Sequence, residues 1–269
     1  MSERKAIFVT GGASGIGRAI ATYFAGRGWF VGVGDVDEAG MRETCSLIPK
    51  DQSFSHKLDV RDRAAWDDAL CGFADAAGGR VDVLANNAGI PLGGSLSENS
   101  VEEIERCLDI NLKGVFFGAQ AALPLLKESA PGSCLLNTAS AAGIYGTPGA
   151  SVYSATKFGV RALTESLDAE WAEFGIKVRS LMPGFIDTPL LEHSPNARSN
   201  EAIRQRVVDA KLEITPPLAV AQAAWDAVHG DRLHVRVGKT AHSMAFAARW
   251  MPGRLRRQVR QNAGGPLGR

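Results

Sequence analysis

The sequence predicts an α/β fold, a single domain with a doubly wound parallel sheet of about seven strands and helices on both faces. Short runs of β-branched and apolar residues alternate with longer amphipathic stretches, and this alternation indicates parallel strands joined by helical crossovers. The chain has 269 residues with 45% hydrophobic content, which is enough to bury one large core. Because no internal repeat or low-complexity segment interrupts the pattern, we expect one domain.

The expected strands are short, and helical periodicity falls between them, for example in residues 16–24 and 153–174. Another helix is expected after Pro216 and Pro217, with Thr215 as its cap, because proline suits the first helical turn. The strands that we expect are Ala6–Val9, Phe30–Val33, Phe54–Leu58, Val81–Ala85, Ser133–Asn137, Lys177–Met182 and Leu233–Val237.

The composition argues against several other classes of protein. Four scattered cysteines, Cys45, Cys71, Cys107 and Cys134, include no C-x-x-C pair and no histidine at metal-ligand spacing, so neither disulfides nor a metal site is expected. A net charge of +1 gives no general case for binding nucleic acid. The N-terminal MSERK lacks the apolar segment of a secretion signal, and no stretch reaches the roughly 18 apolar residues of a membrane span. We therefore expect a cytoplasmic protein.

A glycine-rich turn follows the first expected strand. Residues 10–17 read TGGASGIG, and a helical pattern begins at once. Glycine permits positive φ and lets a phosphate approach the main chain, while the following helix contributes free N–H groups. An ordinary strand-to-helix loop can show the same pattern, but the strand and helix on its flanks favour a pyrophosphate site. The candidate cofactor-binding residues here are Gly11, Ser14, Gly15, Ile16 and Gly17.

Asp35 stands at the end of the second expected strand, 18 residues past Gly17. A carboxylate at this position accepts hydrogen bonds from the adenosine ribose hydroxyls and repels a 2′-phosphate, so NAD is favoured over NADP. The alternative is that Asp35 only caps the next helix.

Together with Asp35 and the pair Asp59–Val60, four motifs make the chain resemble the short-chain dehydrogenase/reductase family over roughly residues 5–230. The motifs are TGxxxGIG at 10–17, NNAG at 86–89, YxxxK at 153–157 and PGxIxT at 183–188. The resemblance implies a Rossmann-type fold, a nicotinamide cofactor and a homo-oligomer, either a dimer or a tetramer. Many members have V-D-G-G after the last strand, whereas this chain has LHVRVGKTAHSM, so a tetramer cannot be assumed.

The resemblance also implies roles for individual residues. Asp59 and Val60 would lie against the adenine, and Asn111 would hold a water that links Lys157 to solvent. The implied catalytic residues are Asn111, Ser140, Tyr153 and Lys157. The implied positions along the ribose and the nicotinamide are Asn87, Ala88, Gly89, Pro183, Gly184, Ile186 and Thr188.

The chemistry of Tyr153 and Lys157 agrees with those roles. Residues i and i+4 share a helix face, so the phenol and the ammonium are neighbours. The ordinary pKa of tyrosine is about 10, and it must fall by roughly three units for tyrosine to act as a base near neutral pH. A cation about 6 Å away, at an effective dielectric constant of about 20, provides roughly two of them. We therefore expect Tyr153 as general acid/base, Lys157 as its activator and nicotinamide-ribose ligand, and Ser140 as a donor to the substrate oxygen.

The expected substrate residues are mostly apolar and follow the catalytic strands. By resemblance, residues 188–215 form a mobile helical lid, in which His193 either contacts a polar substrate group or is simply exposed. The substrate residues that we expect are Ser140, Ala142, Tyr153, Phe185, Leu190 and His193.

The last part of the chain has its own character. No acidic residue follows Asp231, and RLRRQVRQ places arginines beside Leu255 and Val259. We divide the chain into a dinucleotide-binding and catalytic domain, 1–238, and a basic amphipathic tail, 239–269. Such a tail resembles those of family members that act on lipophilic substrates, and it can contact a membrane at the substrate entrance. The alternative is a solvated helix or a helix that contacts another subunit.

The expected function is NAD-dependent interconversion of a secondary alcohol and a ketone, with a lipophilic substrate and with oxidation favoured where NAD is mostly oxidised. One alternative is a 3-oxoacyl-type carbonyl reductase, which ought to prefer the phosphorylated cofactor. Another is a non-catalytic protein that senses NAD, although a substitution at Tyr153 or Lys157 would then be expected.

Overall fold

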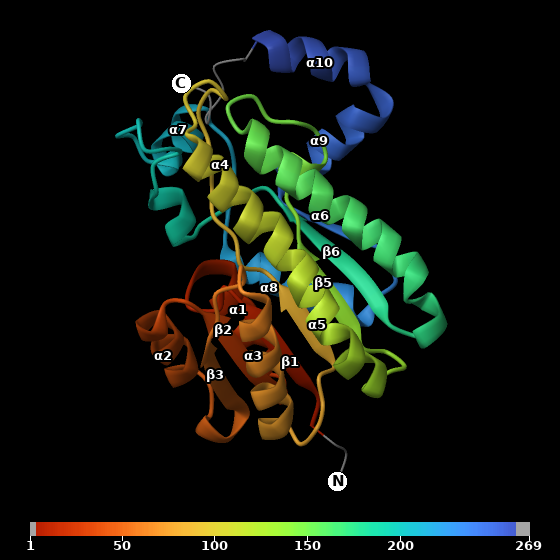
Figure 1. The fold of residues 1–269 in the computed structure, drawn as a ribbon. Helices are drawn as coiled ribbons and strands as arrows, with labels where there is room; N and C mark the ends of the chain where they lie inside the picture. Colours follow the sequence, from red (N-terminus) through yellow and green to blue (C-terminus); the bar gives the residue numbers. More distant parts are fainter. Residues whose placement is uncertain (1–3, 262–269) are drawn as a thin grey trace.

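Seven parallel strands form the middle layer of the molecule in the computed structural model, which describes residues 4–261 (Figure 1). Their order across the sheet is β3-β2-β1-β4-β5-β6-β9. All seven expected strands are present, and their ends lie within two residues of the prediction. Their bounds are β1 Ala6–Thr10, β2 Phe30–Asp35, β3 Ser53–Lys57, β4 Val83–Asn86, β5 Cys134–Thr138, β6 Lys177–Pro183 and β9 His234–Val237.

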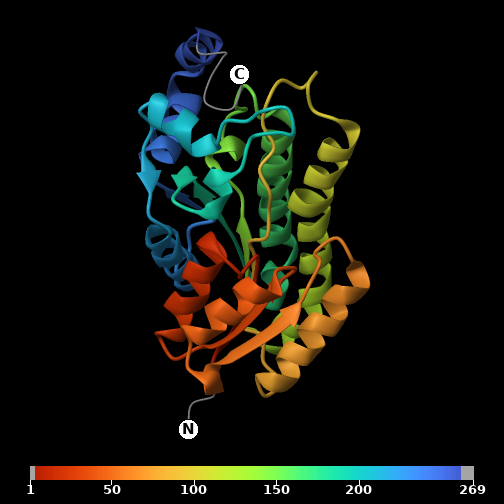
Figure 2. The same ribbon diagram turned by 90° about the vertical axis from the view of Figure 1, so that its left-hand side faces the viewer.

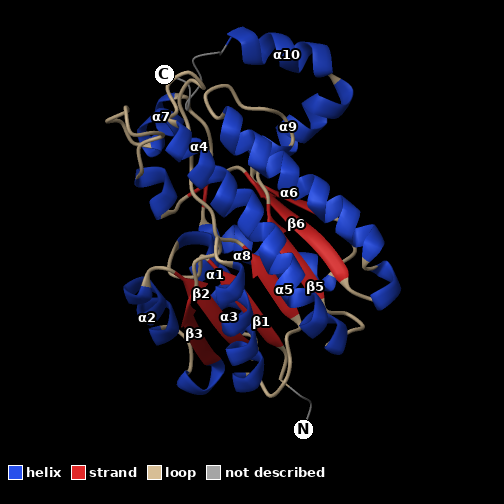
Figure 3. Cartoon of the chain, in the orientation of Figure 1, coloured by secondary structure: helices blue, strands red, loops and turns tan. Residues whose placement is uncertain are grey.

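Helices cover both faces of this sheet (Figure 3). One core cluster joins α1, α2 and α8 to the first face, and a second joins α3, α5 and α6 to the other. The helix bounds are α1 Gly15–Ala25, α2 Glu38–Ser46, α3 Arg63–Ala76, α4 Val101–Leu108, α5 Gly114–Glu128, α6 Ser151–Glu170 and α8 Pro217–His229. The expected doubly wound α/β architecture is therefore confirmed.

The centre of the sheet forms where the sequence is apolar on both sides of a strand. Every residue of β1 is buried: Ile7 and Val9 pack into one core cluster, and Ala6 and Phe8 pack into the other. Because neighbouring side chains of a strand point to opposite faces, a strand between two helical layers must be apolar throughout.

A chain of buried amides connects the centre of the sheet to α6. The Asn86 side chain donates to Asn137 Oδ1 at 3.2 Å, and the Asn137 side chain donates to Thr164 Oγ1 at 3.0 Å. Asn137 and Thr164 are both fully buried, so losing either partner would leave an unpaired polar group in the core. This chain therefore fixes α6 against β4 and β5.

Three details differ from the sequence expectation. The helix expected over 153–174 is α6, which ends at Glu170, and a 3₁₀ turn, Ala172–Phe174, follows it. Thr215 does not cap α8, because it belongs to the short strand β8, Ile214–Thr215, and Pro216 is the cap residue. Strand β8 pairs in parallel with a second unexpected strand, β7, Phe185–Ile186.

The expected lid and tail lie together at the end of the molecule opposite the N-terminus (Figure 2). The lid contains a 3₁₀ turn, Pro189–Glu192, and helix α7, Ile203–Asp209. The tail forms α9, Lys239–Trp250, and α10, Pro252–Gln261. Among the residues that the structure describes, no helix is long and apolar enough to cross a membrane.

The close packing between α5 and the sheet predicts the effect of a small substitution. A Cβ atom added at Gly118 would lie 2.3 Å from Asn86 Oδ1 and 2.6 Å from the Trp66 ring. We expect Gly118→Ala to lower the free energy of unfolding by about 1–3 kcal/mol, measured by urea denaturation, because core overpacking forces side chains to shift.

The control is Gly72→Ala in α3, where the nearest atom to the added Cβ is Phe54 Cζ at 3.4 Å. We expect this variant to be neutral or more stable by up to about 1 kcal/mol, because alanine favours a helix. Equal effects of the two substitutions would contradict the packing argument.

Candidate active site

A cleft of about 540 Å³ lies along the carboxyl ends of the strands. Its walls come from the glycine-rich turn after β1, the segments after β2, β4, β5 and β6, the lid, and the tail helices. A doubly wound sheet is expected to bind ligands at this edge, because the loops after its strands diverge there.

The turn after β1 can adopt its shape only with glycine. Gly11 has φ +65°, and a Cβ there would lie 2.9 Å from Ala88 Cα. A Cβ on Gly17 would lie 2.1 Å from Gly11 O, so this residue lets α1 sit directly on the turn. Gly11, Ser14, Gly15 and Ile16 line the cleft, whereas Gly17 lies behind it. The first N–H groups of α1 have no acceptor within the helix and can therefore receive a phosphate.

Asp35 lines the same end of the cleft. One carboxylate oxygen accepts from the Ala13 amide at 3.1 Å, and the other accepts from the Asp37 amide at 3.1 Å. Asp35 therefore shapes the turn and still presents its negative charge to the cleft. The helix-cap alternative is wrong, because Asp37 is the residue that caps α2.

The segment after β4 is fixed to the end of β1. Thr10 Oγ1 accepts from the amides of Asn87 at 3.0 Å and Ala88 at 3.1 Å, and the Asn87 side chain donates to Thr10 O at 2.9 Å. Asn87, Ala88 and Gly89 all line the cleft.

Tyr153 and Lys157 lie on one face of α6, as expected from their spacing, and both line the cleft. Lys157 Nζ donates to Thr138 O at 2.9 Å and lies 5.5 Å from the centre of the Tyr153 ring. Ser140, two residues beyond β5, also lines the cleft and hydrogen-bonds the Tyr153 hydroxyl. The Ser140 hydroxyl accepts from the Ala142 amide at 3.1 Å.

A lowered pKa was expected for Tyr153, and this direction is wrong when only the groups of the protein act on it. Burial raises the pKa of Tyr153 to about 12, and the hydrogen bond to Ser140 opposes this only in part. Burial also lowers the pKa of Lys157 to about 8. For both groups the cost of removing the charge from water exceeds the stabilisation by neighbouring groups. The phenol is therefore protonated at neutral pH.

Asn111 lies in a π-helical turn, Asp109–Lys113, between α4 and α5. Its side-chain oxygen accepts from the Ile90 amide at 2.8 Å, and its side-chain nitrogen donates to Ile90 O at 2.8 Å. It is fully buried and does not line the cleft. A Cβ on Gly89 would lie 3.2 Å from Asn111 Oδ1 and 3.6 Å from Lys157 Nζ, so both side chains meet behind Gly89.

Two residues expected at the adenine lie outside the cleft. Asp59 forms a bidentate ion pair with Arg61, with N–O distances of 2.9 and 2.6 Å, and hydrogen bonds from Arg61 lower the pKa of Asp59. Asp59 lines a shallow hollow together with Asp109 and Lys113. Val60 is buried and packs against Gly114.

The expected nicotinamide and substrate residues line the cleft, with one exception. His193 is exposed and does not contribute to the wall. Those in the wall, besides Ser140 and Tyr153, are Ala142, Pro183, Gly184, Phe185, Ile186, Thr188 and Leu190.

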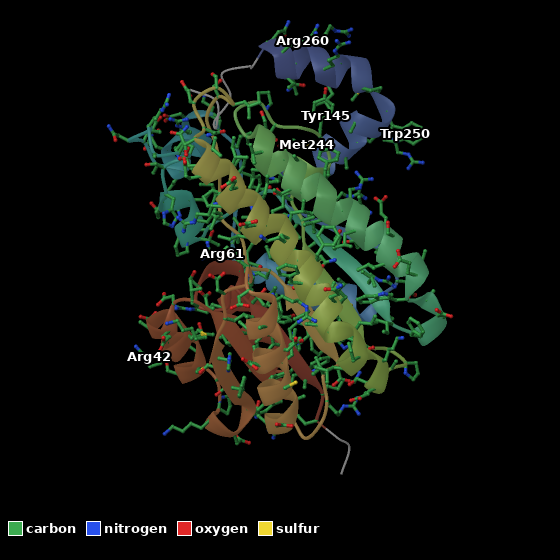
Figure 4. The ribbon with its side chains drawn as sticks, in the orientation of Figure 1. Arg42, Arg61, Tyr145, Met244, Trp250 and Arg260 are labelled. Atoms are coloured by element: carbon green, nitrogen blue, oxygen red, sulfur yellow. The ribbon has the colours of Figure 1, made fainter. Side chains whose placement is uncertain are left out.

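Several wall residues belong to no motif that identifies them in the sequence. The lid contributes Ile203 and Leu212, and the tail contributes Thr240, Met244, Leu255, Gln258 and Val259. In the sequence, the only indication of these wall residues was the spacing of Leu255 and Val259, which places both side chains on one face of α10. Figure 4 shows Tyr145 and Met244 beneath α10.

Comparison with known proteins places this cleft in context. The short chain dehydrogenase family profile matches residues 5–199. The 3-alpha-(or 20-beta)-hydroxysteroid dehydrogenase of Mycobacterium bovis is 38% identical over 192 residues, which cover 71% of this chain and 72% of the relative.

Two solved structures superpose over most of the chain. A short-chain dehydrogenase/reductase from Burkholderia phymatum in complex with NAD has a TM-score of 0.80 and 25% identity, with 96% of this chain and 97% of that chain covered. The 3-ketoacyl-(acyl-carrier-protein) reductase from Brucella melitensis complexed with NADH has a TM-score of 0.78 and 29% identity, with 89% and 99% covered.

The buried ammonium predicts a pH-dependent stability. The pKa of Lys157 falls from 10.5 to about 8 on folding, so between these values the unfolded chain binds more protons and stability rises with pH. We expect the stability of Lys157→Met, relative to that of the unmodified protein, to be highest below pH 8. Its unfolding free energy relative to the unmodified protein should fall by about 2–3 kcal/mol between pH 7 and pH 10.

Urea denaturation over this pH range measures the difference. Lys50→Met, which replaces an exposed lysine, is the control and should show a difference that does not change with pH. A flat difference for Lys157→Met would contradict a lowered pKa.

Proposed function

The chain belongs to the short-chain dehydrogenase/reductase family, and on this basis we propose that it interconverts a secondary alcohol and a ketone with NAD. The observation that carries the proposal is the meeting of Ser140, Tyr153 and Lys157 at the wall of a cleft that begins at the glycine-rich turn.

The residues of the cleft fit a dinucleotide. The cradle at Gly11 and Gly15 would be filled by any Cβ atom, and Asp35 presents a carboxylate at the far end, which favours NAD over NADP. Two similar structures contain NAD and NADH, in agreement with this assignment. Gly11, Ser14, Gly15 and Ile16 would hold the pyrophosphate, and Lys157 the nicotinamide ribose. Held there, NAD would supply a hydride acceptor for the alcohol carbon, and NADH would supply a hydride donor for the ketone.

The side chains supply the proton. In reduction, the Tyr153 hydroxyl donates its proton to the substrate oxygen while Ser140 donates a hydrogen bond to the same oxygen. The raised pKa of Tyr153 suits this direction, because the phenol is protonated at neutral pH. In oxidation, the Tyr153 phenolate accepts the alcohol proton, and this state needs stabilisation by cations, of which Lys157 is one.

The proposed substrate is lipophilic. Leu92, Phe185, Leu190, Leu212 and Met244 give the cleft an apolar wall beyond Tyr153. The hydroxysteroid dehydrogenase relative, at 38% identity, supports a substrate of this kind.

Two alternatives predict different behaviour. A 3-oxoacyl-type carbonyl reductase fits the same catalytic groups, and a similar reductase holds NADH, so the cofactor preference at Asp35 does not argue against it. A panel of steroid, aryl, aliphatic and 3-oxoacyl substrates separates the two. A non-catalytic NAD-sensing protein would bind NAD but turn over none of them.

We also propose a cytoplasmic homo-oligomer, a dimer or a tetramer, that acts on small molecules and not on nucleic acid.

Removing the Tyr153 hydroxyl tests the catalytic assignment. We expect Tyr153→Phe to lower kcat by about 10²–10⁴-fold, because the proton donor is lost, while NAD still binds. The rate of NADH oxidation with a ketone measures kcat, and calorimetry measures NAD binding.

Tyr145→Phe is the matched control, because Tyr145 also lines the cleft but has no part in the proposed proton transfer. It should change kcat by less than about tenfold. Full activity of Tyr153→Phe would overturn the mechanism.

Changing the charge of Asp35 tests the cofactor assignment. Asp35→Asn keeps the size of the side chain and removes its repulsion of a 2′-phosphate, at the loss of one of the two hydrogen bonds from the Ala13 and Asp37 amides. We expect the ratio of kcat/KM with NADP to kcat/KM with NAD to rise by about 100-fold. An unchanged ratio would show that Asp35 does not select the cofactor.

A further inference from the structure

Helices α9 and α10 are apolar toward the cleft. We call residues 239–261 the flap. Met244 of α9 and Leu255 and Val259 of α10 line the cleft, and Leu255 is only 8% exposed. In α10 these two residues are four positions apart and therefore lie on one helix face. The inner side of the flap thus closes an apolar space.

The outer side of the flap carries exposed aromatic residues. Phe246 is 57% exposed and Trp250 is 65% exposed, and their spacing of four places them on one face of α9. Figure 4 shows Trp250 pointing away from the body of the molecule. Of the five tryptophans, all described, Trp29, Trp66 and Trp171 are buried and Trp225 is partly buried. Trp250 is therefore the strongly exposed tryptophan of this chain.

The flap contains only positive ionisable charge at neutral pH. Its six cations are Lys239, Arg249, Arg254, Arg256, Arg257 and Arg260, and it contains no Asp or Glu. Within residues 4–261, none of the six side chains has an ion-pair partner. The four arginines of α10 are all exposed. A partner that complements this surface must be negatively charged.

The combination of aromatic and basic residues identifies the kind of anionic partner. Tryptophan and arginine side chains are suited to the boundary between lipid headgroups and acyl chains. The Arg249 guanidinium lies 5.2 Å from the centre of the Trp250 ring, so charge and apolar surface are presented together.

Within the flap, α9 is attached to the sheet, whereas α10 is attached chiefly to α9. Helix α10 packs chiefly against α9, and α9 packs against β9 and the turn Ala141–Gly143. A displacement of α10 would open the apolar end of the cleft without disturbing the strands that carry the catalytic residues.

We propose that the flap is an interfacial gate: its outer face lies on an anionic lipid surface, and a lipophilic substrate passes from the lipid into the cleft beneath α10. The passage of substrate rests on the proposed function, whereas the lipid contact does not.

Co-sedimentation of the full chain with vesicles tests the contact. We expect binding to phosphatidylcholine vesicles that contain 30% phosphatidylglycerol and much weaker binding to pure phosphatidylcholine. Each cation near an anionic surface contributes about fivefold to binding, so Arg256→Gln together with Arg257→Gln should weaken it roughly thirtyfold. The matched control is the double variant Arg42→Gln, Lys50→Gln, which replaces two exposed cations far from the flap in the sequence. Its affinity for the vesicles should lie within about threefold of that of the unmodified protein.

Tryptophan fluorescence tests the insertion. We expect the emission of the protein to shift to the blue with the anionic vesicles, and the shift to disappear in Trp250→Phe. Binding without this shift would show attraction by charge alone and would overturn the gate. Failure to bind, or equal binding by the Arg256/Arg257 variant, would overturn it as well.

A second copy of the chain is the competing occupant of the outer face. Light scattering of the double variant Phe246→Ser, Trp250→Ser separates the two: an unchanged mass supports the lipid contact, and a smaller mass overturns it in favour of a subunit contact.

Turnover distinguishes failure of the gate from failure of the proposed function. The Arg256/Arg257 variant should keep its rate on a short water-soluble alcohol without vesicles and lose about tenfold or more on a lipophilic alcohol presented in anionic vesicles. No turnover of either alcohol by the unmodified protein would count against the proposed function, and the binding experiments would still decide the lipid contact. Equal loss on both alcohols would overturn the gate.

Discussion

The site depends on a buried ammonium whose position is fixed by the backbone of the sheet. Lys157 is 4% exposed, and it donates to the carbonyl of Thr138 at 2.9 Å. Burial of this charge opposes folding, so the surroundings must hold it firmly. The hydrogen-bonded chain from Asn86 through Asn137 to Thr164 does so by fixing α6 about two turns beyond Lys157. The fold thus holds in place a charged group that would otherwise prefer water, and the same burial keeps the Tyr153 phenol protonated.

Much of the fold and of the cofactor end of the site could be predicted from the sequence. Period and composition identify strands such as β1, where five consecutive residues are buried. The glycines of the first turn are predictable because no other residue fits where Gly11 meets Ala88 and where Gly17 meets Gly11. The spacing of Tyr153 and Lys157 likewise translates directly into a shared helix face.

The remaining features depend on contacts that no local pattern encodes. The sign of the Tyr153 pKa shift follows from the depth of burial, which is a property of the assembled cleft. Asp59 belongs to a motif of the sequence, but its side chain pairs with Arg61 and lines a hollow outside the cleft. The π-helical turn that places Asn111 behind Gly89 has no signature in its composition. The wall contributed by Met244, Leu255 and Val259 is assembled from residues far from every motif.

The position of Gly238 has a consequence for how such a chain can diversify. This residue has φ +86° and joins the last strand of the sheet to α9 and α10, which contribute Met244, Leu255 and Val259 to the apolar wall of the cleft. All residues that we propose to hold the dinucleotide or to move the proton precede it. Exchange of the segment after this junction for another sequence would therefore alter which molecules are accepted while the reactive machinery is inherited unchanged, so related chains can evolve new preferences by replacing a terminus.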